Sequence, residues 1–140
     1  MRLPLQIQTT DTGEIYGVTA LLDSGATGLF IDRDYVKTNQ LTTRKLRLPI
    51  PVYNVDGTRN EAGSITEVVD LILRHAGHSE RTQFAVTGLG RQKLLLGYTW
   101  LREHNPEVDW KTKEVRMTRC PPQCHMCQQE LRQNERRIAQ

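Results

Sequence analysis

Short apolar stretches separated by turn signals constrain the fold of this chain more than any other feature. Apolar and polar residues alternate over residues 3–8, and an apolar run over residues 15–22 follows the turn signal Asp11-Thr12-Gly13. Further strand-like stretches cover residues 29–31, 47–55, 67–73, 81–86, 94–97, 108–110 and 114–117. These stretches follow one another too closely for helical crossovers between parallel strands. The sequence therefore predicts an all-β domain, a small sandwich or a partly closed barrel.

Two kinds of segment break this succession of strands. Residues 100–104 have helical spacing and end at Asn105-Pro106, a natural helix stop, while residues 32–36 fit one helical turn. Pro49 and Pro51 confine the stretch 47–55 to a sheet edge or a projecting arm. With the strand that follows it, this stretch predicts a long hairpin whose tip is at residues 54–58.

Size and charge exclude several classes of protein. The chain has 140 residues, which suits one domain with a buried core. Nineteen Lys and Arg face sixteen Asp and Glu, and this net charge of +3 is far from the basic stripe of a nucleic-acid binder. No apolar run approaches the roughly 20 residues of a membrane span, and no signal-peptide segment opens the chain. We therefore expect a protein made without secretion, located in the cytoplasm, with neither membrane nor nucleic acid as partner.

Asp23 stands at a position where a carboxylate needs an explanation. The mostly apolar run 18–22 precedes Asp23-Ser24-Gly25, and apolar residues return at 29–31. A charged group at the end of a buried strand costs several kcal/mol unless it is compensated. Gly25 allows a sharp turn that presents the carboxylate at the floor of a cleft. An Asp that caps its own turn also fits these three letters, but the apolar flanks favour a functional carboxylate.

Two further stretches indicate a function only when they are considered together with the stretch around Asp23. Alone, Leu94-Leu95-Leu96-Gly97 predicts a buried strand that ends at a turn, and the hairpin tip 54–58 predicts an exposed turn. Together with residues 18–27, they resemble in order and interval the motifs of the retropepsin family, the retrovirus-type aspartic proteases. Residues 96–110, LGYTWLREHNPEVDW, are similar to a long stretch of the proteases of gypsy-type LTR retrotransposons. The resemblance covers roughly residues 3–117.

The resemblance implies a retropepsin-like closed small barrel over residues 1–118, with a flap hairpin and one short C-terminal helix. It also implies an aspartic endopeptidase without a cofactor, in which two carboxyl groups share one proton and activate a water molecule. Because the chain has a single D-[ST]-G, Asp23 would need its symmetry mate in a homodimer.

The implied substrates are extended segments of a retrotransposon polyprotein, and virus-like particles are a further expected setting. A catalytically silent dimerisation or peptide-binding module with the same fold is the alternative interpretation.

Roles for the neighbours of Asp23 also follow from the resemblance. The active-site loop, in which the Ser would hydrogen-bond across the dyad axis and the others would shape the cleft floor, consists of Ser24, Gly25, Ala26 and Thr27. The flap residues, which would close over a peptide bound as an added strand, are Asn54, Val55, Asp56 and Gly57. The second signature loop contains Leu95, Leu96 and Gly97. The tip departs from the glycine-rich retroviral flap, and a charged Asp56 there would alter substrate preference.

Residues 119–140 form a polar tail that contains all three cysteines of the chain. Structural zinc takes four Cys or His ligands, and the candidate ligands in the tail are Cys120, Cys124, His125 and Cys127. The spacing C-x3-C-H-x-C differs from that of a zinc knuckle or finger, and adjacent Cys124 and His125 are awkward joint ligands. We therefore predict a reduced, exposed polyprotein linker without a metal. A metal- or nucleic-acid-binding module centred on this tail is the second alternative.

Overall fold

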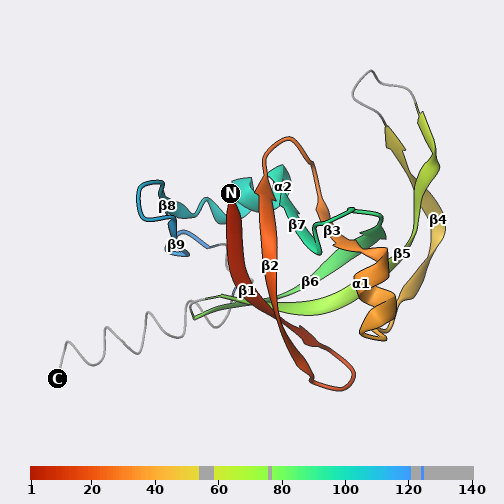
Figure 1. Cartoon of the computed structure of the whole chain (residues 1–140), viewed down its shortest axis with the longest axis horizontal. Helices are drawn as coiled ribbons and strands as arrows, with labels where there is room; N and C mark the ends of the chain where they lie inside the picture. Colours follow the sequence, from red (N-terminus) through yellow and green to blue (C-terminus); the bar gives the residue numbers. More distant parts are fainter. Residues whose placement is uncertain (54–58, 76, 121–123, 125–140) are drawn as a thin grey trace.

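A computed structural model describes residues 1–53, 59–75, 77–120 and 124, without the side chains of residues 52, 53 and 59–63. Nine strands and two short helices make up this part of the chain (Figure 1). In chain order they are β1 (Arg2–Thr9), β2 (Ile15–Asp23), β3 (Leu29–Asp32), α1 (Arg33–Thr38), β4 (Arg44–Tyr53), β5 (Arg59–His75), β6 (His78–Thr87), β7 (Leu94–Gly97), α2 (Tyr98–His104), β8 (Glu107–Asp109) and β9 (Glu114–Arg116). The predicted all-β class is confirmed.

Six of the strands close into a barrel. The large sheet has the order β1-β2-β7-β3-β6-β5-β4, and β1 also pairs with β5, which joins the two ends of the six-strand portion. β1 runs antiparallel to both β2 and β5, whereas β2 and β7 run parallel. Closure removes the free edges of these six strands, so the predicted closed barrel is confirmed.

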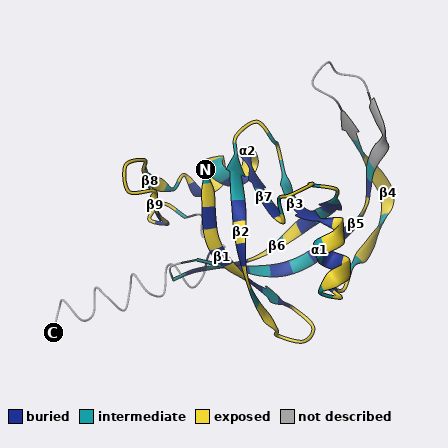
Figure 2. Cartoon of the chain, viewed as in Figure 1, coloured by how far each residue is buried: buried dark blue, intermediate teal, exposed yellow. Residues whose placement is uncertain are grey.

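The barrel interior is filled by alternate residues of the strands. In β1 the side chains of Leu3, Leu5 and Ile7 are buried, while those between them lie toward solvent. Leu71 and Leu73 of β5 are fully buried in the same core cluster. Figure 2 shows this alternation as dark blue and yellow bands along the strands. The period of two in the sequence therefore predicted the core face correctly.

The hairpin of β4 and β5 projects from the barrel (Figure 1). β4 lies at the end of the strand order and pairs with β5 alone, as expected for a strand that carries Pro49 and Pro51. β5 is 17 residues long because it first pairs with β4 in the projecting arm and then continues into the barrel. The tip at residues 54–58 lies outside the described residues.

The two helices are short and belong to the connections. α2 is the predicted C-terminal helix, and α1 covers Arg33–Thr38 where the sequence indicated one helical turn over residues 32–36. Within the described part of the chain, neither helix is long and apolar enough to cross a membrane. β6 begins at His78, three residues before the predicted start, because its pairing with β5 extends to the His75–His78 pair.

Asp32 caps α1, and its removal should destabilise the barrel. Its carboxylate accepts hydrogen bonds from the backbone N–H of Tyr35 at 3.3 Å and of Leu89 at 2.9 Å, so it joins α1 to the connection before β7. Asp32→Ala leaves both donors without this acceptor, and we expect a loss of about 2 kcal/mol in the free energy of unfolding, measured in urea. Asp34→Ala, an exposed change in the first turn, should cost only about 0.3 kcal/mol. Equal losses in the two variants would contradict this role.

Candidate functional site

Asp23 is the last residue of β2, and the parallel neighbour β7 ends beside it. The register pairs Leu21 with Leu95, Leu22 with Leu96 and Asp23 with Gly97. The two motifs that the sequence singled out are thus adjacent in space although they are far apart in the chain. This pairing explains why an apolar run precedes the carboxylate: Val18 and Ala20 of this strand are buried in the barrel, and Asp23 stands where the strand ends.

The loop that follows Asp23 is held by backbone hydrogen bonds to the junction of β7 and α2. Gly97 N–H donates to the carbonyl of Gly28 at 2.9 Å, Tyr98 N–H to that of Ala26 at 2.7 Å, and Thr99 N–H to that of Thr27 at 3.2 Å. These three bonds take up N–H groups at the start of α2 that have no partner within the helix. Backbone contacts therefore hold this loop against the start of α2.

The carboxylate of Asp23 is half-buried and turned toward its own loop. Its Oδ1 accepts a hydrogen bond from Gly25 N–H at 2.9 Å, the Asx turn that the three-letter motif alone allowed. Ser24, Gly25 and Thr27 are exposed. One chain thus presents one oriented carboxylate at the end of a half-buried strand, beside an exposed loop.

The structure brings together some of the predicted site residues. The active-site loop, Ser24 to Thr27, lies beside the second signature, Leu95 to Gly97, through the pairings above. The flap residues Asn54, Val55, Asp56 and Gly57 lie outside the described residues, as do His125 and Cys127 of the tail. Cys120 is half-buried and Cys124 is fully buried, so the expectation of an exposed linker is wrong at these two residues.

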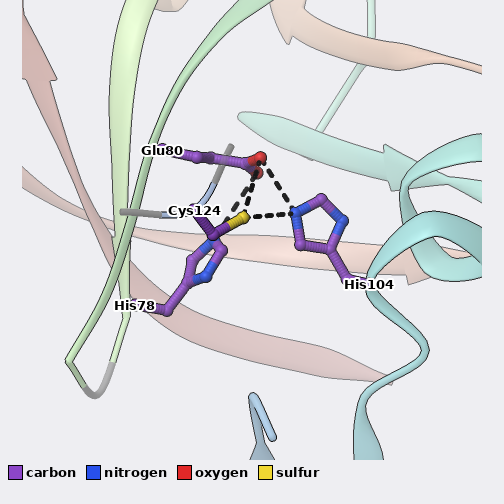
Figure 3. A group of neighbouring side chains, drawn as sticks. All are labelled: His78, Glu80, His104 and Cys124. Carbon is purple, nitrogen blue, oxygen red and sulfur yellow. Dashed lines mark hydrogen bonds and ion pairs between the residues drawn. The ribbon is translucent and has the colours of Figure 1, made fainter. Parts of the chain in front are cut away.

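A second group of functional side chains surrounds Cys124 and was not predicted as a unit. His78 and Glu80 come from β6, and His104 is the last residue of α2 (Figure 3). These three residues and Cys124 are all buried. One candidate ligand atom from each residue lies within 4.8 Å of those of the others. Each side chain carries a nitrogen, oxygen or sulfur atom that can bind a transition metal, so this cluster could hold one.

Electrostatics within the cluster favour the ionised form of Glu80. Burial opposes ionisation of this carboxyl, but hydrogen bonds from His104 and Trp100, together with the imidazole of His78 at 3.6 Å, outweigh it and lower the pKa of Glu80 to about 2. Burial also opposes charging of His104, yet the hydrogen bond and the charge of Glu80 raise the pKa of His104 above its usual value. The cluster therefore has a negative carboxylate that attracts positive charge.

Sequence reasoning missed this cluster because its members are scattered. Residues 78 and 80 precede the strand predicted over residues 81–86, and His104 belongs to the stretch 96–110 that resembles the retrotransposon proteases. Two local signals were present: His78 and Glu80 are two apart and so share one face of a strand, and Trp100 and His104 are four apart on one face of a helix. What joins them to Cys124 is tertiary structure.

Comparison with known proteins identifies a family that includes both motifs around Asp23. Residues 19–127 match the family described as the PEG10/RTL1 protease domain. The chain belongs to this family. The predicted retropepsin-like family is thus confirmed, and the match includes the Asp23 loop, the second signature and Cys124. The domain boundary expected at residue 118 stays a prediction, and the region shared with the PEG10/RTL1 protease domain extends beyond it to residue 127.

Two solved structures share the fold of this PEG10/RTL1-type domain. The retroviral protease-like domain of Ddi1 from Leishmania major has a TM-score of 0.53 and 18% identity, over 85% of this chain and 89% of that chain. EIAV protease in complex with the inhibitor HBY-793 has a TM-score of 0.52 and 16% identity, over 78% of this chain and 93% of that chain. The fold of the chain is therefore retropepsin-like.

Proposed function

We propose that this chain is an aspartic endopeptidase that acts as a homodimer, in which each copy contributes Asp23. The observation that carries the proposal is the position of Asp23, at the end of the half-buried barrel strand β2 and in register with Gly97. The hydrogen bonds from the start of α2 hold the loop around it. Membership of the PEG10/RTL1 protease domain family and the retropepsin-like fold support the same activity.

The chemistry requires two carboxyl groups close together. Side by side they cannot both ionise, so one binds a proton and the other stays charged. The charged carboxylate takes a proton from water, while the protonated one donates a hydrogen bond to the scissile carbonyl. The chain has one D-[ST]-G motif, so the second carboxyl group comes from an identical copy across a two-fold axis. The pair then titrates as a unit.

Exposed apolar side chains on the projecting hairpin and after Gly97 support the binding of a partner or peptide. Leu48 of β4 is 81% exposed, Ile50 is 49% exposed, and Tyr98, which directly follows Gly97, is 50% exposed. Such large apolar groups gain free energy when another chain covers them. An extended peptide bound as an added strand would present every second side chain to these exposed apolar groups. We propose segments of a retrotransposon-type polyprotein as the natural substrates.

Dilution tests the requirement for two chains. We expect the specific activity against a denatured polypeptide, assayed below neutral pH, to fall as the protein is diluted through its dimer dissociation constant. Analytical ultracentrifugation at the same concentrations should show the dimer fraction falling in parallel. Specific activity that stays constant while the dimer dissociates would contradict the shared site.

A silent module is the second candidate, because the Asx turn of Asp23 is also what a purely structural Asp forms. Such a module would dimerise and bind extended peptides without cleaving them. Mass spectrometry of a peptide library after prolonged incubation distinguishes the two: new termini support the endopeptidase, whereas retention of intact peptides on the dimer supports the module.

A further inference from the structure

We propose that His78, Glu80, His104 and Cys124 bind one Zn²⁺ ion, which fastens the segment after β9 to the barrel. Three ligands come from the barrel and α2, and the fourth comes from the cysteine-containing tail. The inference does not depend on the proposed protease activity, because none of these residues belongs to the Asp23 loop.

The four donor atoms all lie within 4.8 Å of one another, and the pairs below, which involve both oxygens of Glu80, have spacings near those of a tetrahedral ion. Cys124 Sγ lies 3.5 Å from His104 Nε2 and 3.8 Å from Glu80 Oε2, while His78 Nε2 lies 3.6 Å from Glu80 Oε1. Ligand atoms of tetrahedral zinc are about 3.3–3.8 Å apart, given Zn–N and Zn–O distances near 2.1 Å and Zn–S near 2.3 Å. The shortest separation, 2.9 Å between His104 Nε2 and Glu80 Oε2, would widen slightly around an ion.

The hydrogen bond behind His104 orients its other nitrogen toward the cluster. Nδ1 lies 2.9 Å from the carbonyl oxygen of Trp100. A carbonyl only accepts hydrogen bonds, so Nδ1 carries a proton and the neutral ring has its lone pair on Nε2. That lone pair faces the Glu80 carboxylate, which also only accepts. Either a second proton on Nε2, which then donates to Glu80, or a metal ion bound to both groups resolves this opposition. A His that donates its other N–H to a backbone carbonyl is the common arrangement of metal ligands.

His78 supplies an independent indication. Its side chain is fully buried, and its Nε2 makes no hydrogen bond within the described residues. Its Nδ1 lies 3.3 Å from Cys120 Sγ, so this nitrogen already has a polar neighbour on the outer side of the cluster. A buried polar atom without a partner costs about 1–3 kcal/mol. Coordination of Nε2 to a metal removes that cost.

Residues next to the four proposed ligands hold the ligand side chains in place. Trp100 Nε1–H donates to Glu80 Oε1 at 2.6 Å, which holds the carboxylate and leaves Oε2 directed at Cys124 and His104. The indole of Trp100 stacks on the His104 ring with centroids 4.4 Å apart. A surface pocket lined in part by Thr99 and Glu103 borders Glu80 and His104, which gives an ion a route from solvent.

Charge balance identifies the ion. A divalent cation, one carboxylate, one thiolate and two neutral imidazoles sum to zero, which avoids the cost of burying net charge. Imidazole and thiolate donors exclude Ca²⁺ and Mg²⁺, which prefer oxygen, and favour Zn²⁺. These four ligands differ from the candidates that the tail sequence suggested, because Cys124 is the one residue common to both groups. Cys120 would instead support His78 from outside.

Metal content of the whole chain, purified under reducing conditions with added zinc, tests the site. We expect about one Zn²⁺ per chain by elemental analysis after gel filtration. Cys124→Ser and His104→Asn should each lower the content to well below half, with folding checked by circular dichroism. Cys127→Ser, the matched control, should retain about one ion. A loss of zinc in Cys127→Ser but not in His104→Asn would overturn the proposal and indicate a site within the tail alone.

Cobalt substitution makes the test independent of whether the variants fold. With the wild-type chain, one equivalent of Co²⁺ should give the intense visible bands of a tetrahedral ion together with a thiolate-to-metal charge-transfer band. Added Zn²⁺ should displace both and raise the Tm of the metal-free chain by roughly 5–10 °C. A six-coordinate cobalt spectrum without thiolate bands, or a Tm unmoved by zinc and by chelator, would overturn the proposal. In that case a proton bridges Glu80 and His104.

Discussion

Asp23→Asn is expected to reduce cleavage of a denatured polypeptide by a factor of about 1,000 or more, while leaving the fold and dimer intact. The amide has nearly the shape of the carboxylate, and its oxygen can still accept the hydrogen bond from Gly25 N–H that turns the loop. It cannot take a proton from water, however, and cannot share one with a second carboxyl group. Only the chemistry should therefore be lost. Initial rates and circular dichroism measure the two effects separately.

Mixing the variant with the wild-type chain sharpens this prediction. If each active site needs two Asp23 carboxyl groups and the chains pair at random, an equal mixture has about one quarter of its dimers competent. Activity per total chain should then fall to about a quarter of that of the wild type, after the subunits have exchanged. A value of one half would mean that each chain acts alone.

Asp34→Asn is the matched control for the removal of one negative charge. Asp34 is an exposed acid in the first turn of α1 and lies outside the loop of Asp23. We expect its activity to equal that of the wild type within about twofold, because exposed surface changes have small effects. Full activity of Asp23→Asn, or an equal loss in both variants, would remove Asp23 from the mechanism.

Gly97→Ala should destabilise the fold by about 3 kcal/mol or more and lower activity at the same time. A Cβ at this position would lie 2.4 Å from the carbonyl oxygen of Gly28 and 2.7 Å from that of Ala26. Both are backbone atoms between β2 and β3, so neither can move aside without breaking the hydrogen bonds from Gly97 and Tyr98. The φ of −89° suits any residue, and the requirement for glycine is therefore one of space.

Gly88→Ala provides the comparison for this substitution. A Cβ at Gly88 would meet no atom within 4 Å. The change should alter the free energy of unfolding by less than about 1 kcal/mol, or stabilise the chain slightly through the unfolded state. Urea denaturation followed by tryptophan fluorescence measures both variants. If Gly97→Ala were as stable as Gly88→Ala, the close contact between the loop and β7 would not be as the structure describes it.

Local patterns in the sequence predicted most of the barrel. The alternation in residues 3–8 identified the core face of β1, because a strand repeats every two residues whatever it packs against. Pro49 and Pro51 identified an edge strand, because proline lacks the N–H that a central strand needs. The start of β6 was misplaced, since its pairing with β5 and not its own composition extends it to His78.

By itself the sequence determined which residues turn the chain, which face the core and which single acid stands at the end of an apolar strand. Those properties are local, and backbone geometry expresses them within a few residues. Only the tertiary structure decided that Gly97 lies against the loop of Asp23, and that Cys124 meets His78, Glu80 and His104 in one buried cluster. Such contacts join elements that are distant along the chain, and only the packing of these elements in the folded chain brings their atoms within a few ångströms.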